Sequence, residues 1–204
     1  MARPTQGCWD RLKKLARYLV QHPRLVLKFL DTGRLPEVVQ VYSDSDWAGC
    51  QRTRKSTSGG VVVVNGTAVK SWSYTQSTLT LSSAEAELVA FVKSAAEALG
   101  AKSLAADLGL ELAIEMFVDA SATIGIANRM GIGRVKHLDV KDLWVQEQLR
   151  RKAFRLTKIA GDANPADVGT KPLSIWEMET KLGAVGVHVS RPPGGTGPVT
   201  FQSA

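Results

Sequence analysis

The sequence predicts an α/β protein whose sheet contains both antiparallel and parallel strands and carries helices on its faces. Three strand-like segments lie between residues 38 and 74, separated by short turns. From residue 82 onward, helical and strand-like segments alternate. Strands joined by tight turns pair antiparallel, whereas strands separated by helices are typical of parallel pairing. Both patterns in one chain therefore indicate a mixed sheet.

The first 36 residues are expected to lie outside the main domain. Residues 9–21 carry apolar side chains at helical spacing and cationic side chains elsewhere, which predicts an amphipathic helix that Pro23 ends. Residues 25–30 are a candidate short strand. Residues 31–36 have the composition of a turn or linker, and we place the domain boundary there.

The three segments that follow predict an antiparallel meander. Residues 38–44 alternate in the period of a strand, and residues 58–64 contain four valines. The dipeptide Asn65-Gly66 then gives a strong hairpin signal before the third segment, residues 68–74. We expect the first segment to pair with the second, and the second with the third.

A long helix is expected next. Ser82 and Glu85 have the spacing of a capping box, in which each side chain hydrogen-bonds the backbone N–H at the other position. An apolar stripe continues through Leu99 and, past a break expected near Gly100, toward Gly109, where the helix should end.

The C-terminal half alternates between helices and strands. The expected elements are a strand at 112–118, a helix at 120–130, a helix at 138–152, a strand at 154–159, a loop at 161–167 and a helix at 175–183. After Arg191 the chain is rich in Pro and Gly without periodicity, which predicts disorder.

Charge and composition restrict the classes of partner. The chain has 204 residues and a formal net charge of +7, which favours polyanions, with nucleic acid ahead of anionic membranes. Its two cysteines have neither disulfide-framework nor zinc-site spacing. No apolar run is long enough to span a membrane, and the N-terminus lacks a signal-peptide core. We therefore expect no membrane partner and a cytoplasmic or nuclear location.

Acidic residues at the ends of predicted elements suggest a shared site. The candidates are Asp44, Glu87, Asp119 and Asp167. Four carboxylates at one point repel each other, and divalent cations reverse the sign of that interaction. Two such ions about 4 Å apart can stabilise both the attacking and the leaving oxygen of a phosphodiester.

Each acid also has an ordinary structural interpretation. Asp44 or Asp46 could cap a turn, and Asp119 or Asp167 could cap the helical segment that follows it. Glu87 alone would more often be a solvated helix residue. The joint arrangement of the four acids is what favours a metal site over these alternatives.

Six separated motifs make the sequence similar to one known family. They are Tyr42-Ser-Asp-Ser-Asp-Trp-Ala-Gly49, Arg54-Lys-Ser-Thr-Ser-Gly59, Ser71-Trp-Ser73, Ser82-Ser-Ala-Glu-Ala-Glu-Leu88, Lys136-His-Leu-Asp139 and Asn164-Pro-Ala-Asp-Val-Gly-Thr-Lys-Pro-Leu173. In this order they closely resemble the ribonuclease H domain of copia-type retrotransposon Pol polyproteins. Residues 3–30 resemble the end of the reverse transcriptase and its connection. The resemblance implies a connection remnant at 1–36, a ribonuclease H-like domain at 37–173, and a C-terminal helix and tail at 174–204.

The resemblance implies a fold and an activity. The fold would be a five-stranded mixed sheet, with three antiparallel strands and then two parallel ones, flanked by helices. The reaction would be cleavage of the RNA strand of an RNA–DNA hybrid, leaving a 5′-phosphate and a 3′-hydroxyl. The partners would be that hybrid and the reverse transcriptase portion of the same polyprotein. An inactive nucleic-acid-binding remnant with the same fold is the alternative.

The resemblance also assigns residues. Two Mg²⁺ ions, or Mn²⁺ in their place, would be held by the four acids, with Asp44 preferred over Asp46 and Glu87 over Glu85. From the residues themselves, Arg54 and Lys55 are the first candidates for nucleic-acid contact, because they are basic and near Asp44 in sequence, and Ser83 and Lys136 are further candidates. His137 is expected to make a structural hydrogen bond. Trp47 and Trp72 could stack on nucleic acid, but we expect them to be buried. Ala120 departs from the family, which usually has a polar residue after the third acid.

Overall fold

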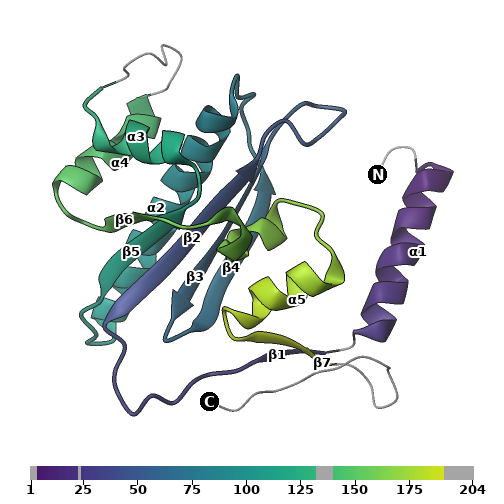
Figure 1. The fold of residues 1–204 in the computed structure, drawn as a ribbon, viewed down its shortest axis with the longest axis horizontal. Helices are drawn as coiled ribbons and strands as arrows, with labels where there is room; N and C mark the ends of the chain where they lie inside the picture. Colours follow the sequence, from purple (N-terminus) through teal and green to yellow (C-terminus); the bar gives the residue numbers. More distant parts are fainter. Residues whose placement is uncertain (1–3, 23, 132–139, 191–204) are drawn as a thin grey trace.

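The computed structural model describes residues 4–22, 24–131 and 140–190, and it confirms the predicted mixed sheet (Figure 1). The five strands are β2 (Val38–Asp46), β3 (Thr57–Val64), β4 (Thr67–Thr75), β5 (Ala113–Val118) and β6 (Arg155–Lys158), in the spatial order β4-β3-β2-β5-β6. The first three pair antiparallel, and β5 and β6 continue the sheet in parallel. This is the ribonuclease H-like fold that the resemblance implied.

Both faces of the interior strand β3 are buried, which explains its run of valines. Val62 packs into the main core together with Leu88 and Phe91 of the long helix. Val61 and Val63 point to the other face and form a second cluster with Val185 near the C-terminus. A strand covered on both sides favours continuous apolar residues over alternation.

The long helix α2 (Ser83–Asp107) lies against one face of the sheet and supplies more buried residues of the main core than any other element. Ser82 caps it, since its hydroxyl accepts a hydrogen bond from the Glu85 backbone N–H. The helix runs through Gly100 without interruption, so the expected break there is wrong. α3 (Ser121–Asn128) and α4 (Val140–Arg150) pack against α2 and match the two predicted helices with shorter bounds.

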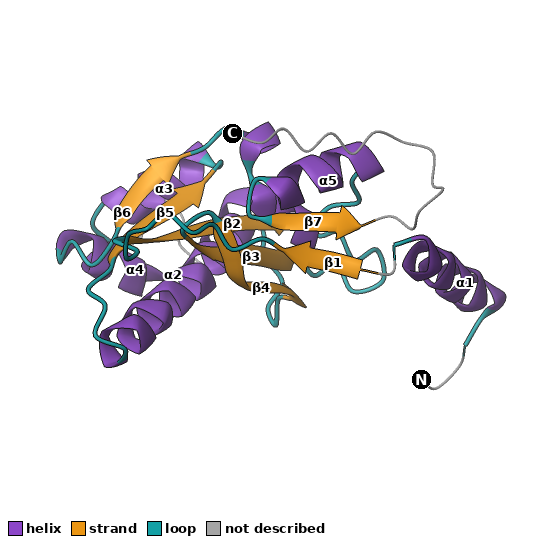
Figure 2. Cartoon of the chain, turned by 90° about the horizontal axis from the view of Figure 1, so that it is seen from below, coloured by secondary structure: helices purple, strands orange, loops and turns teal. Residues whose placement is uncertain are grey.

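Segments from the two ends of the chain cover the opposite face. β1 (Arg24–Leu27) pairs antiparallel with β7 (Val187–Ser190), and α5 (Ile175–Gly183) precedes β7. Figure 2 shows α2 and α5 on opposite sides of the sheet. The sequence did not predict β7, because its four residues are too short for periodicity and its partner strand lies about 160 residues earlier.

The N-terminal helix α1 (Gln6–Gln21) stands apart from the sheet (Figures 1 and 2). It matches the amphipathic helix predicted over 9–21, but all its residues are at least partly exposed. Large apolar side chains on it are more than half exposed, namely Trp9, Leu12, Leu15, Leu19 and Val20. Within the described residues, the structure has no helix with the length and apolar character that membrane crossing requires.

Candidate metal centre

Two of the predicted acids come from neighbouring parallel strands. Asp44 lies near the end of β2 and is almost completely buried. β5 pairs beside β2 in a register that places Phe117 next to Tyr42. Continuing that register by two residues brings Asp119, directly after β5, next to Asp44. Parallel pairing therefore explains how two residues 75 positions apart in sequence come together at the carboxyl ends of β2 and β5.

The third acid is placed by a loop of two short 3₁₀ turns, η1 (Gly161–Ala163) and η2 (Pro165–Gly169). The Asn164 side chain between them donates a hydrogen bond to the Ser43 carbonyl at 3.0 Å and accepts one from the Ala166 N–H at 3.1 Å. Because Asn164 is fully buried, this pair of bonds fixes η2 against β2, one residue before Asp44. Asp167 in η2 therefore faces the same point.

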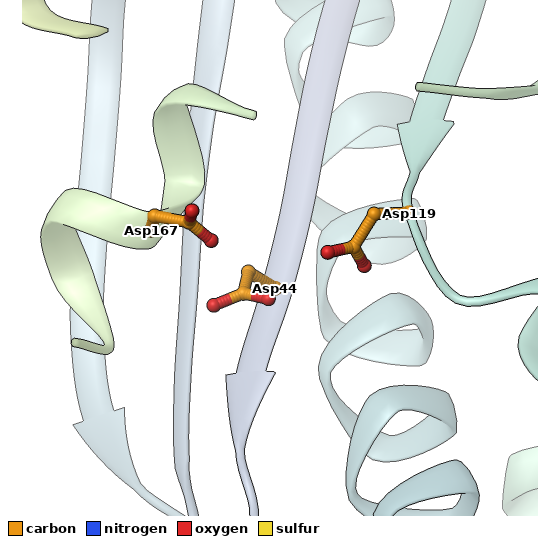
Figure 3. Close-up of side chains that lie close together, drawn as sticks. All are labelled: Asp44, Asp119 and Asp167. Carbon is orange, nitrogen blue, oxygen red and sulfur yellow. The ribbon is translucent and has the colours of Figure 1, made fainter. Parts of the chain in front are cut away.

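Three carboxylates converge as a result (Figure 3). Asp44, Asp119 and Asp167 each offer an oxygen atom, and these oxygens all lie within 4.8 Å of one another. Carboxylate oxygens are the hard ligands that Mg²⁺ and Mn²⁺ prefer. The three aspartates thus fit a common divalent ion.

Glu87 lies beside this group without belonging to it. Burial and, after it, the negative charges of Asp44 and Asp119 together raise the pKa of Glu87 to about 8, although a hydrogen bond from the Ser45 backbone opposes them. The fourth predicted acid is therefore close enough to interact electrostatically with the others. In the metal-free chain at neutral pH, Glu87 is mainly protonated.

A buried amide ties the helix that carries Glu87 to the strand that carries Asp44. The side-chain nitrogen of Gln76 lies 2.9 Å from the Ala86 carbonyl and 3.3 Å from the Ser45 hydroxyl. These partners are the sequence neighbours of Glu87 and Asp44. Gln76 thereby sets the distance between the first turn of α2 and the end of β2.

Two lysines neutralise part of the negative charge. The Lys171 ammonium lies 3.2 Å from Asp44 Oδ1 and 2.8 Å from Asp167 Oδ1. The Lys181 ammonium lies 3.0 Å from Asp167 Oδ2. The hydroxyl of Thr170 donates to Asp44 Oδ2. Every oxygen of Asp44 and Asp167 therefore has a cationic or hydroxyl partner.

Burial and neighbouring charges shift the pKa values of both Asp44 and Lys171. Burial raises the pKa of Asp44, and the hydrogen bond from Thr170 and the charge of Lys171 compensate only in part. Partial burial lowers the pKa of Lys171, but its hydrogen bond to Asp167 and the charges of Asp44 and Asp167 outweigh that effect and raise its pKa overall. Lys171 is therefore charged at neutral pH.

Comparison with known proteins identifies the chain's family. No protein-family model matches it. Over 190 residues, 92% of this chain, it is 30% identical to the retrovirus-related Pol polyprotein of transposon TNT 1-94 from Nicotiana tabacum. Over 196 residues, 93% of this chain, it is 30% identical to that of transposon RE2 from Arabidopsis thaliana. The chain belongs to the copia-type retrotransposon Pol polyproteins. It spans 14% and 13% of the length of these two relatives.

Among solved structures, this Pol segment is similar to the ribonuclease H1 LC11, isolated from compost by a metagenomic approach. The identity is 16% and the TM-score is 0.48, covering 66% of the Pol segment and 93% of LC11. A second structure holds LC11 in complex with an RNA/DNA hybrid. There the identity is 14% and the TM-score is 0.46, with 65% and 93% coverage.

Asp46 and Glu85, the two acids to which Asp44 and Glu87 were preferred, make hydrogen bonds within the fold of the Pol segment. A carboxylate oxygen of Asp46 accepts a hydrogen bond from the Thr57 backbone N–H, which joins β2 to β3. Glu85 accepts one from the Leu81 N–H at 2.6 Å, just before α2. Both carboxylates lie outside the three-acid group. These contacts agree with the preference for Asp44 and Glu87, whose role in metal binding stays a prediction.

The residues predicted to contact nucleic acid differ in exposure and in hydrogen bonding. Arg54 is exposed in the turn between β2 and β3, and the Lys55 ammonium donates to the Ser77 carbonyl at 2.6 Å. Ser83 is exposed at the first residue of α2. Lys136 and His137 lie outside the described residues.

The two tryptophans differ from each other. Trp47 is 53% exposed, so its expected burial is wrong. Trp72 is half-buried and packs against the main core, as expected.

Three residues of the site were not predicted as such. Thr170 and Lys171 stand in the last family motif, and Lys171 follows Asp167 by four residues. In a helical turn that spacing brings side chains together, so it was a usable signal. Lys181 carried no signal, because only the packing of α5 against the loop brings it to Asp167.

Proposed function

We propose that this Pol segment is a ribonuclease H, a metal-dependent endonuclease that cleaves the RNA strand of RNA–DNA hybrids. The convergence of Asp44, Asp119 and Asp167 from three separate elements supports the proposal best. The chain's membership of the Pol polyproteins supports the proposal further, because the six motifs that resemble the family's ribonuclease H domain include Asp44, Glu87 and Asp167.

The four acids would hold two Mg²⁺ or Mn²⁺ ions. Divalent cations at such a site supply stabilisation of the negative charge on the attacking and leaving oxygens of the phosphodiester. Asp44 is central, since Asp119 and Asp167 flank it (Figure 3). Glu87 must lose its proton to become a ligand, and a nearby divalent charge favours that loss. The chain thus provides four anionic ligands around one phosphate position.

The remainder of the chain would hold the substrate. The net charge of +7 favours a duplex with two phosphate backbones. Arg54, exposed in the turn that follows β2, is a candidate phosphate contact, as are Lys55 and the exposed Ser83. Recognition of the RNA strand would use its 2′-hydroxyls, which duplex DNA lacks.

The reverse transcriptase portion of Pol would be a partner in the same polyprotein. The exposed apolar face of α1 supports this, because an amphipathic helix normally buries that face. Leu12, Leu15 and Leu19 would pack against residues of Pol that lie outside this segment.

The test is cleavage of an end-labelled RNA–DNA hybrid with Mg²⁺ or Mn²⁺, beside an Asp119→Asn variant. We expect the parent to release RNA fragments with 5′-phosphate and 3′-hydroxyl ends, and to leave matched DNA–DNA and RNA–RNA duplexes intact. The variant should bind the hybrid without cutting it. If the parent also binds without cutting under all metal conditions, the chain is an inactive binding remnant instead.

A further inference from the structure

We propose that Lys171 is a displaceable internal cation of the metal centre. Its ammonium bridges Asp44 and Asp167 in the metal-free chain and leaves this position when a divalent cation binds. The proposal rests on the proposed metal-dependent function and adds a residue that competes with the metal.

The first argument is an inventory of carboxylate oxygens. On Asp44, Thr170 donates to Oδ2 and Lys171 binds Oδ1. On Asp167, Lys181 binds Oδ2 and Lys171 again binds Oδ1. Both Oδ1 atoms thus share one partner, the Lys171 ammonium, and a divalent ion held by them would compete with it.

The second argument is the difference between the two lysines. The side chain of Lys181 is 7% exposed, and its ammonium also donates to the carbonyls of Gly161, Asp162 and Asn164 at 2.7–3.1 Å. Withdrawing it would take the cation from the buried Asp167 carboxylate and a donor from the buried Asn164 carbonyl, which is costly. The Lys171 side chain is 40% exposed, so its ammonium can be rehydrated when it moves. Lys181 is fixed, whereas Lys171 can leave.

The third argument is charge. With Lys171 in place, one positive charge lies between two carboxylates, where it repels an incoming divalent cation. Without it, Asp44 and Asp167 face each other across a buried site with less neutralisation. Removing the ammonium should therefore strengthen cation binding and weaken the metal-free fold. A residue that helped to bind the metal would have the opposite effect on affinity.

The experiment measures Mn²⁺ binding by calorimetry, without nucleic acid, for the wild-type chain and the Lys171→Met variant. We expect the variant to bind Mn²⁺ about three- to ten-fold more tightly, as befits the loss of partly exposed ion pairs. Its melting temperature should fall in EDTA and recover with saturating Mn²⁺. Lys171→Arg, which retains the charge, should stay close to wild type.

A matched control is Lys93→Met, which removes a partly exposed ion pair to Glu97 on α2 and should leave Mn²⁺ affinity unchanged. If Lys171→Met does not fold without metal, Lys171→Gln, which retains a hydrogen-bond donor, is measured instead. We expect it also to bind Mn²⁺ more tightly than the wild-type chain. Unchanged or weaker Mn²⁺ binding by the folded variant overturns the proposal. A wild-type chain that binds Mn²⁺ and cleaves the hybrid while the variant shows no gain refutes this inference alone. A wild-type chain that binds no Mn²⁺ refutes the metal-dependent function as well.

Discussion

The Lys181 ammonium lies 3.0 Å from Asp167 Oδ2, although the two residues fall on opposite sides of the domain boundary expected after residue 173. The same ammonium donates to three carbonyls of the η1–η2 loop. A loop of two short 3₁₀ turns has few hydrogen bonds of its own with which to fix a side chain. α5 thus supports the loop that places the third aspartate.

Replacing Lys181 by Met should therefore destabilise the fold and loosen the site. Breaking a buried ion pair and removing a donor from these carbonyls costs about 3 kcal/mol, which lowers the melting temperature by roughly 6–12 °C in a chain of this size. Thermal denaturation in EDTA measures this. Lys93→Met, which removes a partly exposed helical pair, should cost less than about 1 kcal/mol. Equal decreases in melting temperature in the two variants would show that the Lys181 contacts stabilise the fold no more than a partly exposed ion pair does.

Most of the fold was predictable, because its elements are local patterns. Each signal lies within a few residues of the element that it predicts. The signals are the valines of β3, the turn at Asn65-Gly66 and the Ser82 cap of α2. The strand pairing followed from the order of these elements. β7 was not predictable, because it exists only through its pairing with β1.

The site divides in the same way. Asp44, Asp119 and Asp167 could be singled out because each stands at the boundary of a predicted element, and the fold brings them together. Asp44 and Asp167 also stand in motifs. The lysines that form ion pairs with these aspartates were harder to predict. Lys181 reaches Asp167 through the packing of a helix, and the number of lysines gives no hint of which one is buried. The distance of Glu87 from the other acids likewise depends on how α2 lies on the sheet.

Glu87 should make the metal-free chain less stable as the pH rises. Its pKa is about 8 in the folded chain and 4.5 as the ordinary value. The folded state therefore holds this proton over a range where the unfolded state has lost it, and stability falls between about pH 4.5 and pH 8. The loss amounts to about 3–5 kcal/mol. Urea denaturation in EDTA from pH 5 to pH 8 measures this slope.

Glu87→Gln should flatten that slope, because the amide cannot ionise. Glu97→Gln is the control. Hydrogen bonds from Lys70 and Lys93 lower the pKa of Glu97, so its stabilisation is lost only below pH 4.5 and the slope above pH 5 should persist. A parent chain whose stability is constant from pH 5 to pH 8 would contradict the raised pKa. Mn²⁺ should reduce the slope in the parent, since a divalent ion favours the carboxylate.

A side chain at Gly59 should destabilise the fold and disturb the site. A Cβ at this position would lie 2.9 Å from the Ala166 carbonyl oxygen and 2.7 Å from Thr170 Cγ2, both next to Asp167 or Lys171. Gly59→Ala should therefore push η2 away from β3, cost about 1–3 kcal/mol and weaken Mn²⁺ binding. Gly100→Ala is the matched control, because its Cβ would meet no atom within 4 Å in the middle of α2. That variant should be stabilised by about 0.5–1 kcal/mol. Unaltered Mn²⁺ affinity in Gly59→Ala would show that the loop position does not matter to the site.

Trp47 should contribute to hybrid binding. It directly follows β2, and its indole N–H donates to the Thr80 carbonyl at 3.2 Å, so the ring is held in place while 53% of the residue stays exposed. A fixed exposed aromatic ring near the end of the strand that carries Asp44 can pack on a sugar or an accessible base; stacking on the bases of single strands is worth about 1–3 kcal/mol. Trp47→Ala should weaken hybrid binding at least about five-fold in Ca²⁺, measured by fluorescence anisotropy, with Mn²⁺ affinity unchanged. Trp9→Ala on α1, where the residue is 55% exposed, is the control and should bind the hybrid as the parent does. Equal binding by the parent and both variants would assign Trp47 to a structural role, through its bond to Thr80 just before the start of α2.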